Sequence, residues 1–225
     1  MGTDLKLMGR YYDLSNPVHE KMPYYPSSFK PKVEQSSTVE EKGFNVCKIT
    51  MAYHHGTHVD APRHISNEGM PVDELDLNKF IGEGVVLDLS FKEIGSGISA
   101  NDLETFSDSI HPKDIVVLYT GSSNYLGESW INSKYTYLDK SGAEWLVKKG
   151  AKSVGIDFFS IDKYGDSANP AHSVLLGNGV PLIEEISCEA KHLLGKRIFL
   201  ICLPIKMKTG DGAPARVIAY ALTSL

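Results

Sequence analysis

Short runs of apolar and β-branched residues recur along the chain and predict the strands of a sheet. Runs of this length and composition are typical of buried strands. The runs are residues 83–90, 114–120, 152–157, 197–203 and 215–222. Two earlier strands are expected at residues 30–39 and 43–53, and the partial alternation from Phe44 to Met51 predicts that the second of them is half buried.

Three helices are expected between these strands. Residues 140–149 follow Asp139, a side chain that can cap a helix N-terminus, and they end at Gly150, a residue suited to a helix C-terminus. The other two helices are residues 100–107 and 170–177. Strands that alternate with helices indicate an α/β layer structure, and the consecutive early strands indicate some antiparallel pairing, so the sheet should be mixed. No repeat or linker divides the sequence, which predicts one domain over residues 1–225.

The composition is that of an average globular protein. Hydrophobic residues make up 42% of the 225 residues, and a chain of this length buries about 70% of its unfolded surface. It therefore needs no metal merely to fold, and any metal is expected to take part in chemistry. The formal net charge of −5 argues against nucleic-acid binding, which requires a basic surface.

The cysteines and the first residues indicate the compartment. Cys47, Cys188 and Cys202 lie far apart and form no C-x-x-C motif, a pattern expected of reduced, buried thiols in the cytoplasm. Residues Met1 to Lys6 contain no apolar signal core, and no apolar run approaches the roughly 18 residues of a membrane span. We therefore expect a cytoplasmic protein without a membrane partner.

Four of the eight histidines fall within one short segment, from His54 to His64. The same segment contains Gly56, Asp60 and Pro62. Imidazole nitrogens together with a carboxylate suit Zn²⁺ or a similar divalent ion. A polar loop with clustered histidines and no metal is the ordinary alternative.

The spacing within this segment decides which side chains can share one metal ion. On a helix, Asp60 would point about 240° away from His54, and in an extended strand His54 and His58 would lie about 13 Å apart. Ligand atoms on one ion lie only roughly 3.3 Å apart. The chain must therefore curl after His54, with Gly56 supplying the turn. His54, His58 and Asp60 are then candidate ligands on a tight loop after a strand, whereas His55 points away and is left out.

Three protein ligands leave an open position on a metal ion, which is typical of a catalytic site. Further ligands should come from elsewhere in the chain. The candidate is His172, which begins a short helix that is followed by a glycine turn and a strand carrying Glu184. An ordinary surface or core histidine is the alternative. Motifs of other enzyme classes are absent, since the sequence has no G-x-S-x-G, H-E-x-x-H, P-loop or G-x-G-x-x-G.

The histidine segment matches the signature H-x-G-T-H-x-D-x-P-x-H, from His54 to His64. With it, the sequence resembles the metal-dependent cyclase-like hydrolases, a family that includes bacterial kynurenine formamidase (arylformamidase), isatin hydrolase and a dienelactone hydrolase. The resemblance extends over almost the whole chain. The flanking motifs that support it are Asp13-Leu14-Ser15-x-Pro17, Met22-Pro23-x-x-Pro26, Gly155-x-Asp157-x-x-Ser160-x-Asp162, Leu203-Pro204-x-Lys206 and Asp211-Gly212-Ala213-Pro214-Ala215-Arg216.

The resemblance implies a ligand set, a cofactor and a fold. His54, His58 and Asp60 would bind one metal ion. Asp60 would also bridge to a second ion, completed by His172 and Glu184. The cofactor implied is Zn²⁺, with two ions, while some relatives use a single metal, often Mn²⁺. The fold would be the family's swivelling β/α/β type, assembled as a homodimer or homotetramer.

The resemblance also implies the chemistry. A metal-bound hydroxide would attack an amide or lactone carbonyl, and His64 would be the general acid/base that takes a proton and returns it to the leaving amine. The predicted function is hydrolysis of a small amide or cyclic amide or ester, of the arylformamidase type, which converts N-formylkynurenine to kynurenine and formate. The alternatives are a lyase or cyclase, an isatin or lactone hydrolase with the same metal site, and a non-catalytic metal-binding module.

Aromatic residues near the N-terminal motif are candidates for substrate binding. In the formamidases a Trp precedes the Pro of this motif, and Tyr25 stands in that place here. Tyr24, Phe158 and Phe159 could complete an aromatic wall, and a role in the core or an interface is the alternative. Residues 206–216 are expected to form a structural turn rather than a substrate clamp.

Overall fold

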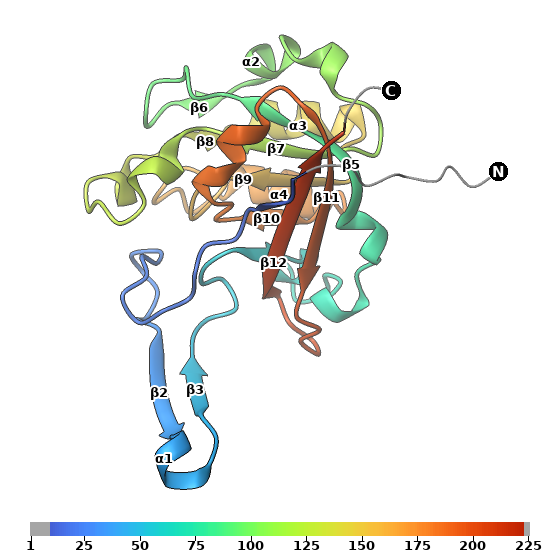
Figure 1. The fold of residues 1–225 in the computed structure, drawn as a ribbon. Coiled ribbons are helices and arrows are strands. Elements are labelled where there is room, and N and C mark those ends of the chain that lie inside the picture. Colours follow the sequence, from blue (N-terminus) through green and yellow to red (C-terminus); the bar gives the residue numbers. More distant parts are fainter. Residues whose placement is uncertain (1–9, 223–225) are drawn as a thin grey trace, which may run out of the picture.

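The computed structural model describes residues 10–222, and its centre is a mixed eight-stranded sheet (Figure 1). The strands follow the order β1-β12-β11-β5-β7-β9-β10-β4. Their bounds are β1 (Tyr12–Asp13), β4 (His58–Asp60), β5 (Ile81–Asp88), β7 (Ile115–Tyr119), β9 (Ser153–Ile156), β10 (Leu182–Glu184), β11 (Arg197–Pro204) and β12 (Gly212–Ala221). All five apolar runs correspond to strands of this sheet, as predicted.

The sheet closes on itself because β4 pairs along both of its edges. Asp60 lies opposite Leu182 of β10 on one side and opposite Gly212 of β12 on the other, antiparallel in both cases. Strands β5, β7, β9 and β10 run parallel to one another, while β11 and β12 form an antiparallel hairpin. The predicted α/β architecture with a mixed sheet is confirmed, and the sheet curls into a barrel-like form.

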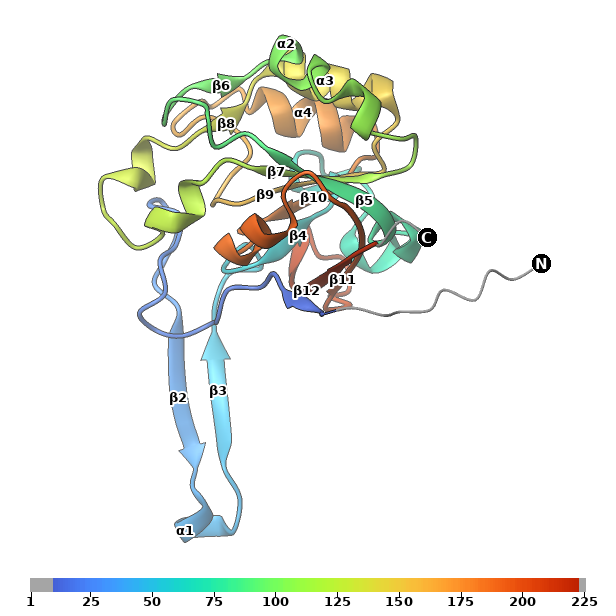
Figure 2. The same cartoon turned by 45° about the horizontal axis from the view of Figure 1, so that its top comes forward.

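The two faces of the sheet bury different cores, because strand side chains alternate between faces. Val85 and Val116 belong to one core, whereas their neighbours Val86 and Val117 belong to the other. The helices are α1 (Val39–Lys42), α2 (Ala100–Glu104), α3 (Lys140–Lys149) and α4 (Pro170–Gly177), and a small second sheet pairs β6 (Gly97–Ile98) with β8 (Tyr137–Leu138). Helices α2, α3 and α4 together cover the first face (Figure 2).

The helices agree with the predicted ranges, with one difference. Asp139 caps α3 through its side chain, and Gly150 ends that helix with a φ of 79°. The helix predicted at 100–107 is shorter, since α2 ends at Glu104. The chain turns there so that Phe106 can pack against the core under the helices.

The two early strands pair with each other and not with the main sheet. β2 (Lys32–Ser37), α1 and β3 (Val46–Thr50) form an arm that projects from the domain (Figures 1 and 2). The prediction that the second strand is half buried is wrong, because every residue of β3 is exposed. The alternating apolar and polar side chains of β3 lie on the two opposite faces of an exposed hairpin. Ile49 points to one face, and Lys48, paired with Glu34, points to the other.

Within residues 10–222, no helix has the length and apolar character needed to cross a membrane. The three cysteines form no disulfide in the same part of the chain; Cys202 is buried, but the expectation of a buried thiol is wrong for Cys47, which is exposed on the arm. The predictions made for Met1 to Lys6 concern residues outside the described range.

Candidate metal centre and active site

Strand β4 presents His58 and Asp60 on one face, because they are two residues apart. Glu184 of β10 lies opposite His58 and therefore joins the same face. The expectation that all three early ligands share a tight loop is wrong, since β4 is held as a strand along both edges and only His54 lies on the turn before it. Gly56 forms that turn with a φ of 69°, as predicted.

Helix α4 brings His172 to the same place. The carboxylate of Asp162 accepts hydrogen bonds from the N–H groups of Ala171 and His172 at the start of the helix. It also hydrogen-bonds His172 Nδ1 at 2.6 Å. The ring is thereby fixed with Nε2 lying 3.3 Å from an Asp60 oxygen and 3.5 Å from a Glu184 oxygen.

Asp60 is at the centre of the cluster. Its Oδ1 lies 2.7 Å from His54 Nδ1 and 3.3 Å from His58 Nε2, whereas its Oδ2 faces His172 Nε2 at 3.3 Å. Glu184 spans the same two sides, with Oε2 3.6 Å from His58 Nε2 and Oε1 3.5 Å from His172 Nε2. The five residues predicted as ligands are therefore brought together. The carboxylates of Asp60 and Glu184 lie between His58 and His172.

His58 gives the sharpest sign that the cluster suits a cation. Its side chain is 1% exposed, its Nδ1 contacts the carbonyl oxygen of Gly56 at 2.7 Å, and its Nε2 has no hydrogen-bond partner among the described residues. A buried polar atom without a partner costs about 1–3 kcal/mol. With Nδ1 donating to the carbonyl, a neutral ring turns a lone pair toward two carboxylates, an arrangement that a bound cation stabilises. The residues present therefore fit a divalent metal ion.

The candidate ligand histidines are each supported from behind. The ring nitrogen that faces away from Asp60 contacts an oxygen atom in every case, and such contacts fix the tautomer and orientation of metal-binding histidines. The pairs are His58 with the Gly56 carbonyl, His172 with Asp162, and His54 with Asp211.

Asp211 is the residue that sequence reasoning missed. Its Oδ2 lies 2.9 Å from His54 Nε2 and 3.4 Å from His64 Nδ1. Residues 206–216 include the turn between β11 and β12, as expected, but the turn also reaches the site because β12 pairs with β4. The one sequence signal for Asp211 was its place at the start of a flanking motif.

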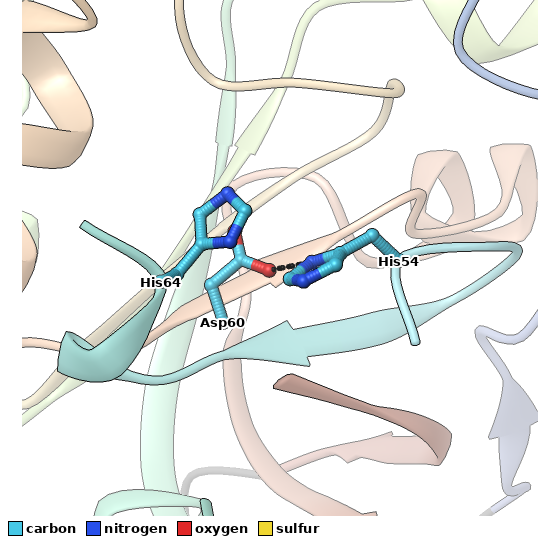
Figure 3. A group of neighbouring side chains, drawn as sticks. All are labelled: His54, Asp60 and His64. Carbon is cyan, nitrogen blue, oxygen red and sulfur yellow. Dashed lines mark hydrogen bonds and ion pairs between the residues drawn. The ribbon is translucent and has the colours of Figure 1, made fainter. Parts of the chain in front are cut away.

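His64 lies beside Asp60, on the far side of that carboxylate from the backbone of His54 (Figure 3), and its side chain is partly exposed. It ends the 3-10 turn that follows β4, and its ring centroid is 4.2 Å from that of His54. Burial lowers the pKa of His64. The negative charge of Asp60 acts in the opposite direction but is the smaller effect, so the ring is neutral near pH 7. His54, Asp60 and His64 also lie close enough to share an ion, so the position of His64 fits a ligand as well as a proton-transfer group.

The two buried carboxylates have opposite pKa shifts. Burial opposes ionisation of Asp60, but the positive charge of His54 and a hydrogen bond with His172 hold its pKa well below the usual value. Burial and the negative charge of Asp60 raise the pKa of Glu184 well above its usual value. Burial lowers the pKa of His54, but Asp60 and Asp211 outweigh it and raise that pKa to about 10. Protons thus occupy the metal-free cluster, and a metal ion must displace them.

A cavity of about 540 Å³ opens over the cluster. Tyr25 and Phe159 both line it, so the predicted substrate-binding residue lies beside the predicted ligands. Phe158 is fully buried in an aromatic core behind Phe159. Tyr24 lies instead beside His55, the histidine left out of the predicted site.

Comparisons of sequence with known proteins extend over nearly the whole chain. Residues 12–163 match the family model described as putative cyclase. The chain is 32% identical over 212 residues to the kynurenine formamidase of Geobacillus thermodenitrificans, covering 93% of this chain and 97% of that protein. It is 30% identical over 209 residues to the kynurenine formamidase of Bacillus cereus, covering 92% and 96%.

Solved structures share the fold. A potential metal-dependent hydrolase with cyclase activity matches with a TM-score of 0.80 at 27% identity, covering 96% of this chain and 99% of that one. An isatin hydrolase bound to the product analogue thioisatinate matches with a TM-score of 0.87 at 20% identity, covering 95% and 92%. The predicted family, fold and hydrolase class are confirmed by these comparisons. The chain therefore belongs to the putative cyclase family.

Proposed function

We propose that this enzyme is a metal-dependent hydrolase of a small aromatic amide or cyclic amide or ester, of the arylformamidase type. The observation that carries the proposal is the unpartnered Nε2 of His58 among buried carboxylates, beneath a cavity lined by Tyr25 and His64. The relatives named kynurenine formamidase support N-formylkynurenine as the substrate, with kynurenine and formate as products.

The proposed ligands divide between the two oxygens of Asp60. His54, His58 and Asp60 would hold one ion, and Asp60, His172 and Glu184 would hold a second. We propose two Zn²⁺ ions, with Mn²⁺ or a single ion as the alternatives, because nitrogen and carboxylate ligands suit these metals. The chemistry that a divalent ion supplies in such a site is acidification of a water molecule and polarisation of a carbonyl group.

His64 is the proposed general acid/base. Its ring is neutral near pH 7, so it can accept a proton from water and return it to the leaving amine. Asp211 contacts Nδ1, which orients the ring and leaves Nε2 for proton transfer. Proton transfer by a positioned side chain typically contributes about 10²–10⁴-fold in rate.

Tyr25 is the proposed contact for the aromatic part of the substrate. It lines the cavity, and its ring lies 5.7 Å from that of Tyr164. Aromatic rings at such distances stabilise one another in offset or tilted arrangements. A substrate ring stacked on Tyr25 would keep its amide above Asp60 and His64.

The test combines elemental analysis with turnover of N-formylkynurenine before and after chelation and metal return. About two equivalents of Zn²⁺ per chain and turnover that chelation abolishes would support the proposal. Bound metal without turnover would remove this substrate and direct the assay to isatin and lactones. No metal under any condition would refute the proposal. Solvent ¹⁸O in the released formate separates a hydrolase from a lyase.

We also propose that the chain assembles as a homodimer or homotetramer. The support comes from the arm, because an isolated two-stranded hairpin is marginally stable in water. Cys47 and Ile49 share a face of the arm that no other part of the chain covers within residues 10–222. Light scattering is expected to give a dimer or tetramer for the wild type and a shift toward monomer for Ile49→Lys. A monomeric wild type would refute the proposal.

A further inference from the structure

A serine and a histidine that the proposed metal chemistry does not use form a hydrogen-bonded pair at the wall of the cavity. Ser28 lines the cavity, and its Oγ lies 2.7 Å from Nε2 of His55. His55 is 1% exposed, and its ring packs against those of Tyr24 and Phe29. A serine beside a histidine is also the arrangement of a nucleophile and its base in many hydrolases. The position of the ring hydrogen decides which role this pair can have.

The backbone fixes the hydrogen on the His55 ring. The N–H of Ala52 donates to Nδ1 of His55 at 3.2 Å, and the N–H of His55 donates to the carbonyl oxygen of Ala52 at 3.3 Å. A nitrogen that accepts a hydrogen bond carries a lone pair, so the ring is neutral and its one hydrogen is on Nε2. Nε2 therefore donates to Ser28 Oγ. His55 cannot take the hydrogen of Ser28, and the pair is not a nucleophile with its base.

The Ser28 hydroxyl is left with a hydrogen to donate. Its oxygen accepts from His55, and no group within residues 10–222 accepts its own hydrogen. A hydroxyl group has one hydrogen and two lone pairs, so the bond from His55 uses one lone pair and leaves the hydrogen available. A chain of hydrogen bonds also strengthens each donor in it. The pair therefore presents a directed donor to a ligand in the cavity.

The turn that carries Ser28 also carries Tyr25. The N–H of Ser28 donates to the carbonyl oxygen of Tyr25 at 2.8 Å, and Pro26 occupies the second position of this turn, where its fixed φ is favoured. Tyr25 and Ser28 both line the cavity. The hydroxyl is therefore held close to the proposed contact for the aromatic part of the substrate.

We propose that Ser28 is a specificity-determining residue whose hydroxyl donates a hydrogen bond to a carbonyl oxygen on the aromatic part of the substrate, and that His55 positions this hydroxyl. This inference rests on the proposed function. Neither Lys nor Arg is among the described residues that line the cavity, so no side chain there compensates the charge of a carboxylate, and a neutral carbonyl is favoured. Such a donor discriminates against analogues that lack the acceptor, because the donor is then left unpaired.

The test compares Ser28→Ala with the wild type on two matched substrates. N-formyl-2-aminoacetophenone carries a ketone on the ring, and formanilide lacks it. We expect kcat/KM for the first substrate to fall about tenfold, the effect of one lost hydrogen bond, and kcat/KM for the second to change less than about twofold. Ser173→Ala is the matched control, because Ser173 lines the same cavity but its hydroxyl donates to the carbonyl oxygen of Ala168. Its preference between the two substrates should equal that of the wild type.

Variants of His55 separate a positioning role from a structural one. His55→Phe removes the N–H that faces Ser28, so the hydroxyl hydrogen is no longer directed into the cavity. The preference for the ketone substrate should then lie between those of the wild type and Ser28→Ala, and the double variant should equal Ser28→Ala. His55→Gln keeps an N–H donor and should restore part of the preference. This ratio does not change when stability or metal content affects both substrates alike, and full preference in His55→Phe would overturn the positioning role.

The result that would overturn the inference is an equal loss of kcat/KM with both substrates in Ser28→Ala, as a nucleophile would give, or no loss with either. If the wild type hydrolyses neither substrate, the proposed function fails, and calorimetric binding of 2-aminoacetophenone then decides. Binding about tenfold weaker to Ser28→Ala, with aniline bound equally by both proteins, supports the inference. Equal or absent binding of 2-aminoacetophenone overturns it.

Discussion

The two sides of Asp60 differ in how far they are removed from water. On one side, the His58 and His172 side chains are 1% and 7% exposed. On the other side, His54 and His64 are 24% and 33% exposed. The buried side is built from β4, β10 and α4, whereas the open side is built from the turns before and after β4. Regular structure holds His58 and His172 in place, whereas turns expose His54 and His64 to the cavity.

This difference indicates a division of tasks. Charge–charge interactions are stronger away from water, so the buried side is suited to holding a metal ion. Residues on loops over a rigid scaffold are suited to contact with substrate and water. Substitutions on the buried side should therefore change metal content and activity together, whereas substitution of His64, the open-side histidine that is not a proposed ligand, should change activity more than metal content.

The largest effect is expected at Asp60, which both sides share. Asp60→Asn keeps the size of the side chain but removes the negative charge that faces His54, His58 and His172. We expect loss of metal from both sides and a fall in kcat/KM on the order of 10³-fold or more. Elemental analysis after dialysis and steady-state kinetics measure these effects, with exposed Asp108→Asn as the control. Full metal content in Asp60→Asn would show that Asp60 is not needed to hold metal on either side.

The next largest effect is expected at His64. His64→Ala should lower kcat about 10²–10⁴-fold and leave the metal content unchanged, because the buried side stays intact. The exposed His192 provides a matched control in His192→Ala. Loss of metal together with activity would instead make His64 a ligand, and the division of tasks would then not apply to the open side.

A smaller effect is expected at Asp211, which supports the open side alone. Asp211→Asn weakens the contacts to His54 and His64, and loss of such a supporting group typically lowers metal affinity or activity about 10–100-fold. A chelator titration should show one metal equivalent released more easily and the other retained as in the wild type. Equal weakening of both equivalents would mean that the two sides are not independent.

The smallest effect on turnover is expected at Glu185, which lies beside the cluster. Burial raises its pKa from 4.5 to about 8, against a hydrogen bond from the Gly56 backbone. Because the folded pKa lies above the unfolded one, its contribution to stability is full below about pH 4.5 and is lost as pH rises toward 8. Glu185→Gln cannot ionise, so its melting temperature relative to the wild type should rise from pH 5 to pH 8 in the metal-free protein. If the difference in melting temperature between the two proteins does not change with pH, the raised pKa of Glu185 is contradicted.

Local patterns in the sequence were enough to single out His54, His58 and Asp60 as candidate ligands, whereas His172 was one candidate with an ordinary alternative and the role of Glu184 came from the family resemblance. The histidine segment is contiguous, and turn residues separate the helix of His172 from the strand of Glu184. Asp211 could not be predicted, because its contact with His54 depends on the pairing of β12 with β4, and three residues of β4 give no periodic signal.

The arm shows a different limit of sequence reasoning. The alternation in residues 43–53 is the same for a half-buried strand and for a free hairpin with one apolar and one charged face. Only the surroundings in the folded protein distinguish the two, and these depend on which elements pack nearby.

The double pairing of β4 has a consequence for how the enzyme is made. A ribosome releases the histidine segment first, and Asp211 follows His54 by 157 residues. Contacts of such high sequence separation form slowly, because the entropy of closing a long loop opposes them. The nascent chain thus exposes four histidines before it has a place to hold an ion. The contact between Asp211 and His54 can therefore form only after the β11–β12 hairpin has brought Asp211 to β4, and a metal ion would find the complete site only then.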